Sequence, residues 1–126
     1  MSGWSEALIA ARYVSLETFR RSGVGVRTPI WFAVGPDGVM YVYTLADSGK
    51  AKRVRANGRA RVAACTMGGR VTGDWVEASA RVVGADAYRV GMGLIDRKYW
   101  PWKGLLNLAS SLRPRERVVI ALVPVG

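Results

Sequence analysis

The sequence contains no histidine and only one cysteine among its 126 residues. The absence of histidine excludes Ser-His-Asp and Cys-His catalysis, most zinc sites and ordinary proximal haem ligation, and no metal site is predicted. The single cysteine, Cys65, cannot form a disulfide within the chain. It lies in the apolar run RVAACTM, which predicts a buried, inert thiol. If the protein is an enzyme, a cofactor is therefore expected to carry the reaction.

Acidic residues are also scarce, with 9 Asp and Glu against 19 Lys and Arg and a formal net charge of +10. This balance suggests an anionic partner without naming one. No apolar run approaches the roughly 20 residues that span a bilayer, and the N-terminus lacks the features of a signal peptide. We therefore expect a soluble, cytoplasmic protein. Its length and 50% apolar content predict a single domain, residues 1–126, with a packed core.

Alternating apolar residues predict a series of short strands. Residues 11–19 form the first, after a short helical lead, and 24–34 and 39–45 form a hairpin around the turn GPDG. A second hairpin joins 59–67 to 71–84, and 117–125 is the closing strand. Helices are expected from Gly49 to about Asn57, over 86–100, and over 101–112. Antiparallel strands with few helices predict a mainly-β, Greek-key-like barrel or sandwich.

Most of the excess charge lies in the stretch SGKAKRVRANGRAR, residues 48–61, which contains no acid. If a helix begins at Gly49, Lys50 and Lys52 lie in its first turn, where each cation opposes the helix dipole by about 0.3–1 kcal/mol. A phosphate at this turn would meet free N–H groups, both ammonium groups and the hydroxyls of Ser48 and Thr44. A solvated basic face is the alternative interpretation of the same charges.

The stretch TPIWFAVGPDGVMYVYTLADSGKAKRVRANGRARVAA, followed by GDWVEASARVV, resembles the flavin split-barrel superfamily, related to pyridoxamine 5'-phosphate oxidase. The likeness extends over residues 12–84 and is closest to the deazaflavin branch, the coenzyme F420-dependent oxidoreductases. Its signature is a proline-containing second strand, a third strand that ends in Thr, and S-G-K-x-K-R-x-R before the next strand. The resemblance implies a six-stranded antiparallel split β-barrel with short helices, working as a homodimer with cofactor sites at the subunit interface.

The resemblance also assigns residues to the cofactor. Lys50 matches the phosphate-binding lysine and Lys52 the basic residue two positions later, and Arg55 is a further candidate. The residues implied to support the phosphate, at a strand end and the turn after it, are Thr44, Ser48 and Gly49. Those implied to lie along the tricyclic ring are Thr28, Pro29, Ile30 and Trp31. Pro29 also fits an edge strand, because proline cannot donate to a sheet ladder.

The implied reaction is hydride transfer from C5 of the reduced deazaflavin to an unsaturated small molecule. No catalytic proton donor is assigned, and the aromatic segment 98–103 is either a lid or a packing contact. The carboxylate-rich tail of coenzyme F420 suits an arginine-rich surface better than FMN does, which makes further cations candidates for its path: Arg53, Arg55, Lys98 and Lys103. Three tyrosines are conceivable proton donors, although packing is the simpler interpretation of each: Tyr41, Tyr43 and Tyr88.

Three alternatives remain. The first is an FMN-dependent oxidoreductase of the same superfamily, and the second is a carrier that binds deazaflavin without turnover. The third is a non-enzymatic basic barrel that binds single-stranded nucleic acid. Nucleic acid is not the expected partner, because the cations gather at one helix start instead of following an aromatic-lined strand surface.

Overall fold

The computed structural model describes residues 3–99 and 116–125. The helix predicted over 101–112 and most of the aromatic segment 98–103 lie outside these residues. The elements follow one another as α1 (Glu6–Ala10), β1 (Tyr13–Phe19), β2 (Gly25–Ile30), β3 (Phe32–Val34), β4 (Met40–Leu45), α2 (Gly49–Ala56), β5 (Arg59–Cys65), β6 (Val76–Val82), α3 (Ala85–Tyr99) and β7 (Arg117–Pro124).

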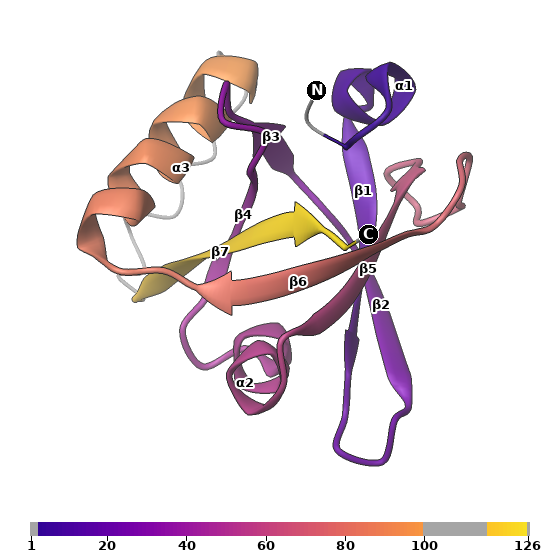
Figure 1. Cartoon of the computed structure of the whole chain (residues 1–126), viewed down its shortest axis with the longest axis vertical. Helices are drawn as coiled ribbons and strands as arrows, with labels where there is room; N and C mark the ends of the chain where they lie inside the picture. The colour runs from indigo at the N-terminus through magenta and orange to yellow at the C-terminus, as the bar shows by residue number, and fades with distance from the viewer. Residues whose placement is uncertain (1–2, 100–115, 126) are drawn as a thin grey trace.

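The described strands form one antiparallel sheet in the order β2-β1-β5-β6-β7-β4-β3. Its two edge strands, β2 and β3, are consecutive in the chain and are separated only by Trp31. The sheet therefore curls until its two edges approach the same point of the chain, which gives a split barrel (Figure 1). The prediction of a mainly-β antiparallel barrel with short helices is confirmed.

The described residues contain seven strands, whereas six were predicted. The stretch 24–34, expected to be one strand, is divided, because Gly25–Ile30 pairs with β1 and Phe32–Val34 pairs with β4. The cause is a tertiary contact: the N–H of Phe32 donates to the hydroxyl oxygen of Tyr99 on α3 (3.1 Å). Only the last residues of the predicted strand therefore form the hairpin with β4.

The second predicted hairpin is also shorter than expected, since β5 and β6 pair only over Arg59–Val62 and Val76–Ser79. Residues 66–75 form a loop beside β5, where the N–H of Thr72 donates to the carbonyl oxygen of Ala64 (2.8 Å). Trp75, expected on the second strand, lies at the end of this loop. Along β6 itself the predicted alternation is confirmed, with alanines buried and polar side chains exposed.

Hydrophobic clusters occupy both faces of the sheet. The inner cluster fills the barrel, and Leu8 of α1 and Val54 of α2 join it from opposite ends (Figure 1). The outer cluster lies between α3 and strands β3, β4 and β7. Gly91 permits this approach, because a Cβ there would lie 2.9 Å from side-chain atoms of Tyr41 and Val119. Among the described helices, none is long and apolar enough to cross a bilayer.

Candidate functional site

The residues predicted to hold a phosphate meet where β4 ends and α2 begins. Ser48 is the N-cap of α2: its backbone is extended (φ −67°, ψ 156°) and its hydroxyl oxygen accepts from the N–H of Ala51 (3.2 Å). The hydroxyl of Thr44 donates to Ser48 Oγ (3.1 Å). The N–H groups of Gly49 and Lys50 have no acceptor among the described residues, so they are available to a ligand.

Three cations gather at this turn without an acid to neutralise them: Lys50, Arg53 and Arg20. Burial lowers the pKa of Lys50, and the charge of Arg53 lowers it further. Burial and the charge of Arg20 lower the pKa of Arg53 in the same way. None of the three forms an ion pair with another residue of the described chain. A bound anion would relieve this repulsion, which is the electrostatic property of a phosphate site.

Arg53 belongs to the turn more closely than predicted. Its Nε donates to the hydroxyl oxygen of Thr18, a buried residue of β1 (2.7 Å). Its guanidinium also lies against Gly49, where a Cβ would be only 2.6 Å from Nη1. The sequence suggests only that Arg53 lies on the path of a cofactor tail. The i, i+4 spacing of Gly49 and Arg53 is the signal for the closer placement, because helical side chains lean toward the N-terminus. Nothing in the sequence points to Thr18.

The other two predicted cations of α2 lie on its exposed side. Lys52 is exposed. Arg55 is exposed as well, and its Nη1 donates to the carbonyl oxygen of Ala46 in the turn before α2 (3.0 Å). Arg55 therefore stabilises the turn, and a direct role of either side chain toward a cofactor stays a prediction.

The proposed path for a cofactor tail is not continuous. Lys98 of α3 contacts the ring of Phe32, with Nζ 3.3 Å from the ring centroid, and donates to the carbonyl oxygen of Ile9 (3.4 Å). Burial of its ammonium group lowers the pKa of Lys98 to about 8. These contacts lie near the α1 end of the barrel, opposite to α2 (Figure 1). Lys103 lies outside the described residues.

The predicted ring-binding segment runs along the edge strand β2. Pro29 is exposed at this edge, which suits a residue without an N–H. Thr28 lies opposite Leu16 of β1 on the inner face, and its hydroxyl oxygen is buried with no hydrogen-bond partner in the described part of the chain. An unsatisfied buried hydroxyl is unfavourable, so a polar ligand atom there would be stabilising. Ile30 packs, partly buried, against the inner cluster.

Trp31 is fixed by packing against α3. Its ring stacks on that of Tyr99, with centroids 4.4 Å apart and 8° between the planes. The hydroxyl of Tyr99 donates to the carbonyl oxygen of Arg12 (2.6 Å) and accepts from the N–H of Phe32. Burial raises the pKa of Tyr99 to about 12, so the group stays protonated. The role of Trp31 along a cofactor ring stays a prediction.

The remaining candidate groups lie in packed parts of the molecule. Cys65 is buried, and burial raises the pKa of its thiol, as predicted for an inert cysteine. Tyr41 and Tyr43 of β4 and Tyr88 of α3 all belong to the outer cluster between α3 and the sheet. In residues 3–99 and 116–125, no group of three or more Cys, Asp or Glu side chains could hold a metal ion.

Solved structures similar to this fold include three informative cases. Rv2991 of Mycobacterium tuberculosis, a conserved hypothetical protein, has a TM-score of 0.70 at 23% identity, covering 96% of this chain and 81% of its own. A protein named F420 reductase has a TM-score of 0.61 at 19% identity, covering 98% and 94%. A Listeria innocua protein assigned as a pyridoxamine 5'-phosphate oxidase has a TM-score of 0.60 at 14% identity, covering 94% and 88%. No protein-family model and no curated protein matches the chain.

These likenesses show a shared fold. The chain is a split barrel of the kind seen in proteins similar to pyridoxamine 5'-phosphate oxidase, and the likeness extends over nearly its whole length. The resemblance found in residues 12–84 is thus confirmed for the fold.

Proposed function

We propose that this protein is an oxidoreductase that binds coenzyme F420 and reduces an unsaturated small molecule. The observation that carries the proposal is the group of uncompensated cations at the start of α2, Lys50, Arg53 and Arg20, beside free helix N–H groups. The fold shared with a protein named F420 reductase supports the choice of a deazaflavin. When bound, the reduced deazaflavin supplies the hydride from its C5.

The residues present fit both ends of such a cofactor. Lys50, Arg53 and the N–H of Gly49 would bind the phosphate, and the unpartnered hydroxyl of Thr28 would bind a polar atom of the ring. β1 connects the two places, because Thr18 binds Arg53 and lies two residues from Leu16, the partner of Thr28. Two strand residues extend over about 7 Å, a distance that a ribityl chain can bridge.

The chain contributes binding and orientation to the proposed reaction. The phosphate turn is fixed by the cap of Ser48, and Thr28 lies on a strand of the sheet, so both anchors are rigid. Rigid anchors hold a cofactor in one orientation toward its substrate. Water would protonate the reduced product. We also propose a homodimer with the cofactor at the subunit interface, since Pro29 leaves the edge of β2 exposed.

FMN is the second candidate cofactor. It has the same phosphate and ribityl chain, so the turn at Ser48 would hold it equally well. The observation that favours FMN is the position of Lys98 at the end of the barrel opposite α2, which leaves the acidic tail of coenzyme F420 without that cation. The fold shared with the protein assigned as a pyridoxamine 5'-phosphate oxidase is compatible with this alternative.

Titration with oxidised coenzyme F420 and with FMN, followed by fluorescence, tests the proposal. We expect tighter binding of the deazaflavin and a loss of at least about tenfold, or 1.4 kcal/mol, in Lys50→Ala. The matched control is Arg89→Ala, which removes one positive charge from the exposed side of α3. Equal cofactor affinities of the wild type and Lys50→Ala would mean that the phosphate does not bind at this turn. Tighter binding of FMN than of coenzyme F420 would mean that FMN is the cofactor.

A further inference from the structure

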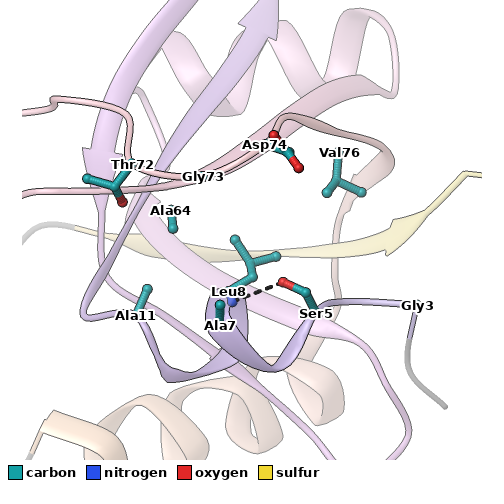
Figure 2. A pocket seen from close by; sticks show the side chains of 10 residues that line it. All are labelled: Gly3, Ser5, Ala7, Leu8, Ala11, Ala64, Thr72, Gly73, Asp74 and Val76. Atoms are coloured by element: carbon teal, nitrogen blue, oxygen red, sulfur yellow. Dashed lines mark hydrogen bonds between the residues drawn. The ribbon is translucent and has the colours of Figure 1, made fainter.

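A cavity of about 450 Å³ lies between α1 and the loop that precedes β6 (Figure 2). Leu8, Ala64 and Val76 form its apolar part, which is continuous with the inner hydrophobic cluster. Thr72 and Asp74 are exposed and form its polar rim. Residues of α1 line the cavity, and α1 and α2 lie at opposite ends of the barrel (Figure 1), so the cavity is separate from the proposed phosphate site at the start of α2. Its volume is within the usual range of small-molecule sites.

The loop wall of the cavity is held in place by the sheet. The N–H of Thr72 donates to the carbonyl oxygen of Ala64. Trp75 is the next residue after Asp74, and the centroid of its ring lies 4.6 Å from the guanidinium carbon of Arg27 and of Arg61. Both arginines are in turn bound to the buried carboxylate of Glu17 on β1, so this wall is anchored at both ends.

The α1 wall is anchored as well. The indole N–H of Trp4 donates to the carbonyl oxygen of Gly38 (2.9 Å), and its side chain is buried. The hydroxyl of Ser5 caps α1 through the N–H of Leu8 (3.1 Å), and Leu8 itself is only 4% exposed. With both walls fixed, the cavity is preformed, as small-molecule sites usually are.

The charge at the rim indicates which kind of ligand fits. The chain has 19 cations and 9 acids, yet the carboxylate of Asp74 has neither an ion pair nor a hydrogen bond with any described residue. The side chain of Asp74 is therefore free to bind a ligand at the edge of an apolar surface (Figure 2). A carboxylate in that position favours a positively charged group and disfavours a negatively charged one.

We propose that this cavity binds a small hydrophobic amine. Its apolar body would pack on Leu8, Ala64 and Val76, and its ammonium group would lie at the carboxylate of Asp74. The proposal does not depend on the cofactor assignment, because none of these residues belongs to the phosphate turn or to the predicted ring segment 28–31.

Three probes of similar shape test the charge preference on the full chain: phenethylammonium, 3-phenylpropanoate and neutral propylbenzene. Backbone amide shifts in NMR titrations locate the binding and give the affinities. We expect phenethylammonium to shift amides of α1 and residues 72–76 and to bind at least tenfold more tightly than 3-phenylpropanoate. Shifts confined to other residues, or equal affinity for the two ions, would overturn the proposal.

Gly73→Val tests the cavity itself. The φ of Gly73 is not positive, and its added Cβ would lie 3.5 Å from the Cβ of Ala64, so a larger side chain can enter the cavity. We expect at least a tenfold loss of phenethylammonium binding in this variant and no change in Gly84→Val, whose Cβ would meet nothing within 4 Å. If Gly73→Val unfolds, Ala7→Leu fills the cavity from the exposed side of α1.

Asp74→Asn tests the charge at the rim. We expect a loss of several-fold for phenethylammonium and no loss for propylbenzene. Asp86→Asn, at an exposed acid of α3, is the matched control and should change neither affinity. Unchanged phenethylammonium affinity in Asp74→Asn would remove the carboxylate from the proposed site. If Gly73→Val and Ala7→Leu both fold and bind phenethylammonium as tightly as the wild type, the amine does not bind in this cavity.

Discussion

Glu17 is a buried acid whose two oxygens are each bound by an arginine from a neighbouring strand. Arg27 Nε lies 3.0 Å from Oε2, and Arg61 Nε lies 2.7 Å from Oε1. Burial alone would raise the pKa of Glu17, but the hydrogen bonds and charges of both arginines outweigh it and hold the pKa below the ordinary value of 4.5. The ionised carboxylate therefore stabilises the fold above that pH, and its contribution is lost as the pH falls through the lowered pKa.

Glu17→Gln should reveal this contribution. We expect a loss of about 2 kcal/mol in the free energy of unfolding near neutral pH, between the values for exposed and buried ion pairs. The difference from the wild type should shrink as the pH falls from 4.5 through the lowered pKa, where the carboxyl of the folded wild type becomes protonated. Thermal unfolding measured across this range checks it, with Glu77→Gln as the control because its contact with Arg59 is long (3.7 Å) and exposed. A difference that is constant with pH would contradict the assignment.

Thr28→Val separates folding from cofactor binding. Because the hydroxyl oxygen of Thr28 is buried without a partner, its removal should leave the stability of the cofactor-free protein unchanged or raise it by about 1 kcal/mol. If the hydroxyl binds the cofactor ring, the same variant should bind coenzyme F420 several-fold more weakly. Chemical denaturation and fluorescence titration of one preparation give both quantities. Weaker binding together with lower stability would indicate a packing defect instead.

At this scale, the sequence predicts those site residues that are neighbours in the chain. The cap at Ser48, the helix start at Gly49 and the cation at Lys50 follow from local rules. The contact between Arg53 and Thr18 spans 35 positions and depends on how α2 packs on β1, which no local pattern contains. This contact can be predicted only when the packing of α2 on β1 is known.

Among the elements, α3 determines where the second predicted strand is divided. Tyr99 accepts from the N–H of Phe32 and donates to the carbonyl oxygen of Arg12, so one hydroxyl joins α3 to the start of β3 and to the residue before β1. The alternation in 24–34 correctly indicates extended chain. It could not show that the chain changes partner from β1 to β4 at Trp31, because that change depends on a residue 67 positions from Phe32.

Tyr99→Phe should loosen this junction while keeping the ring stack on Trp31. It leaves the N–H of Phe32 and the carbonyl of Arg12 without their partner, so we expect a loss of about 1–3 kcal/mol in stability. The control is Tyr88→Phe on the same helix, for which a change within about 0.5 kcal/mol is expected. Urea denaturation measures the stability, and faster hydrogen exchange at Phe32 would locate the effect. Unchanged exchange at that amide would contradict the role of the hydroxyl.

For the whole molecule, the closure of the sheet and the excess of positive charge act together. The two edges of the sheet come from one stretch of chain, so its seven described strands curl into a barrel. Folding into the barrel brings the charges that make up the net +10 closer together, and the repulsion between them opposes folding. Salt should therefore stabilise the protein by screening, whichever anion is used.

Phosphate should stabilise the protein beyond this general screening, because Lys50, Arg53 and Arg20 offer it a specific site. At equal ionic strength we expect a melting temperature several degrees higher in phosphate than in chloride, since binding only to the folded state at ten times the dissociation constant adds about 1.4 kcal/mol. Lys50→Ala should lose the difference between the two anions but keep the screening effect, whereas Arg89→Ala should keep both. A phosphate effect that persists in Lys50→Ala would mean that the anion acts through the overall charge, and the turn at Ser48 would lose its physical basis as an anion site.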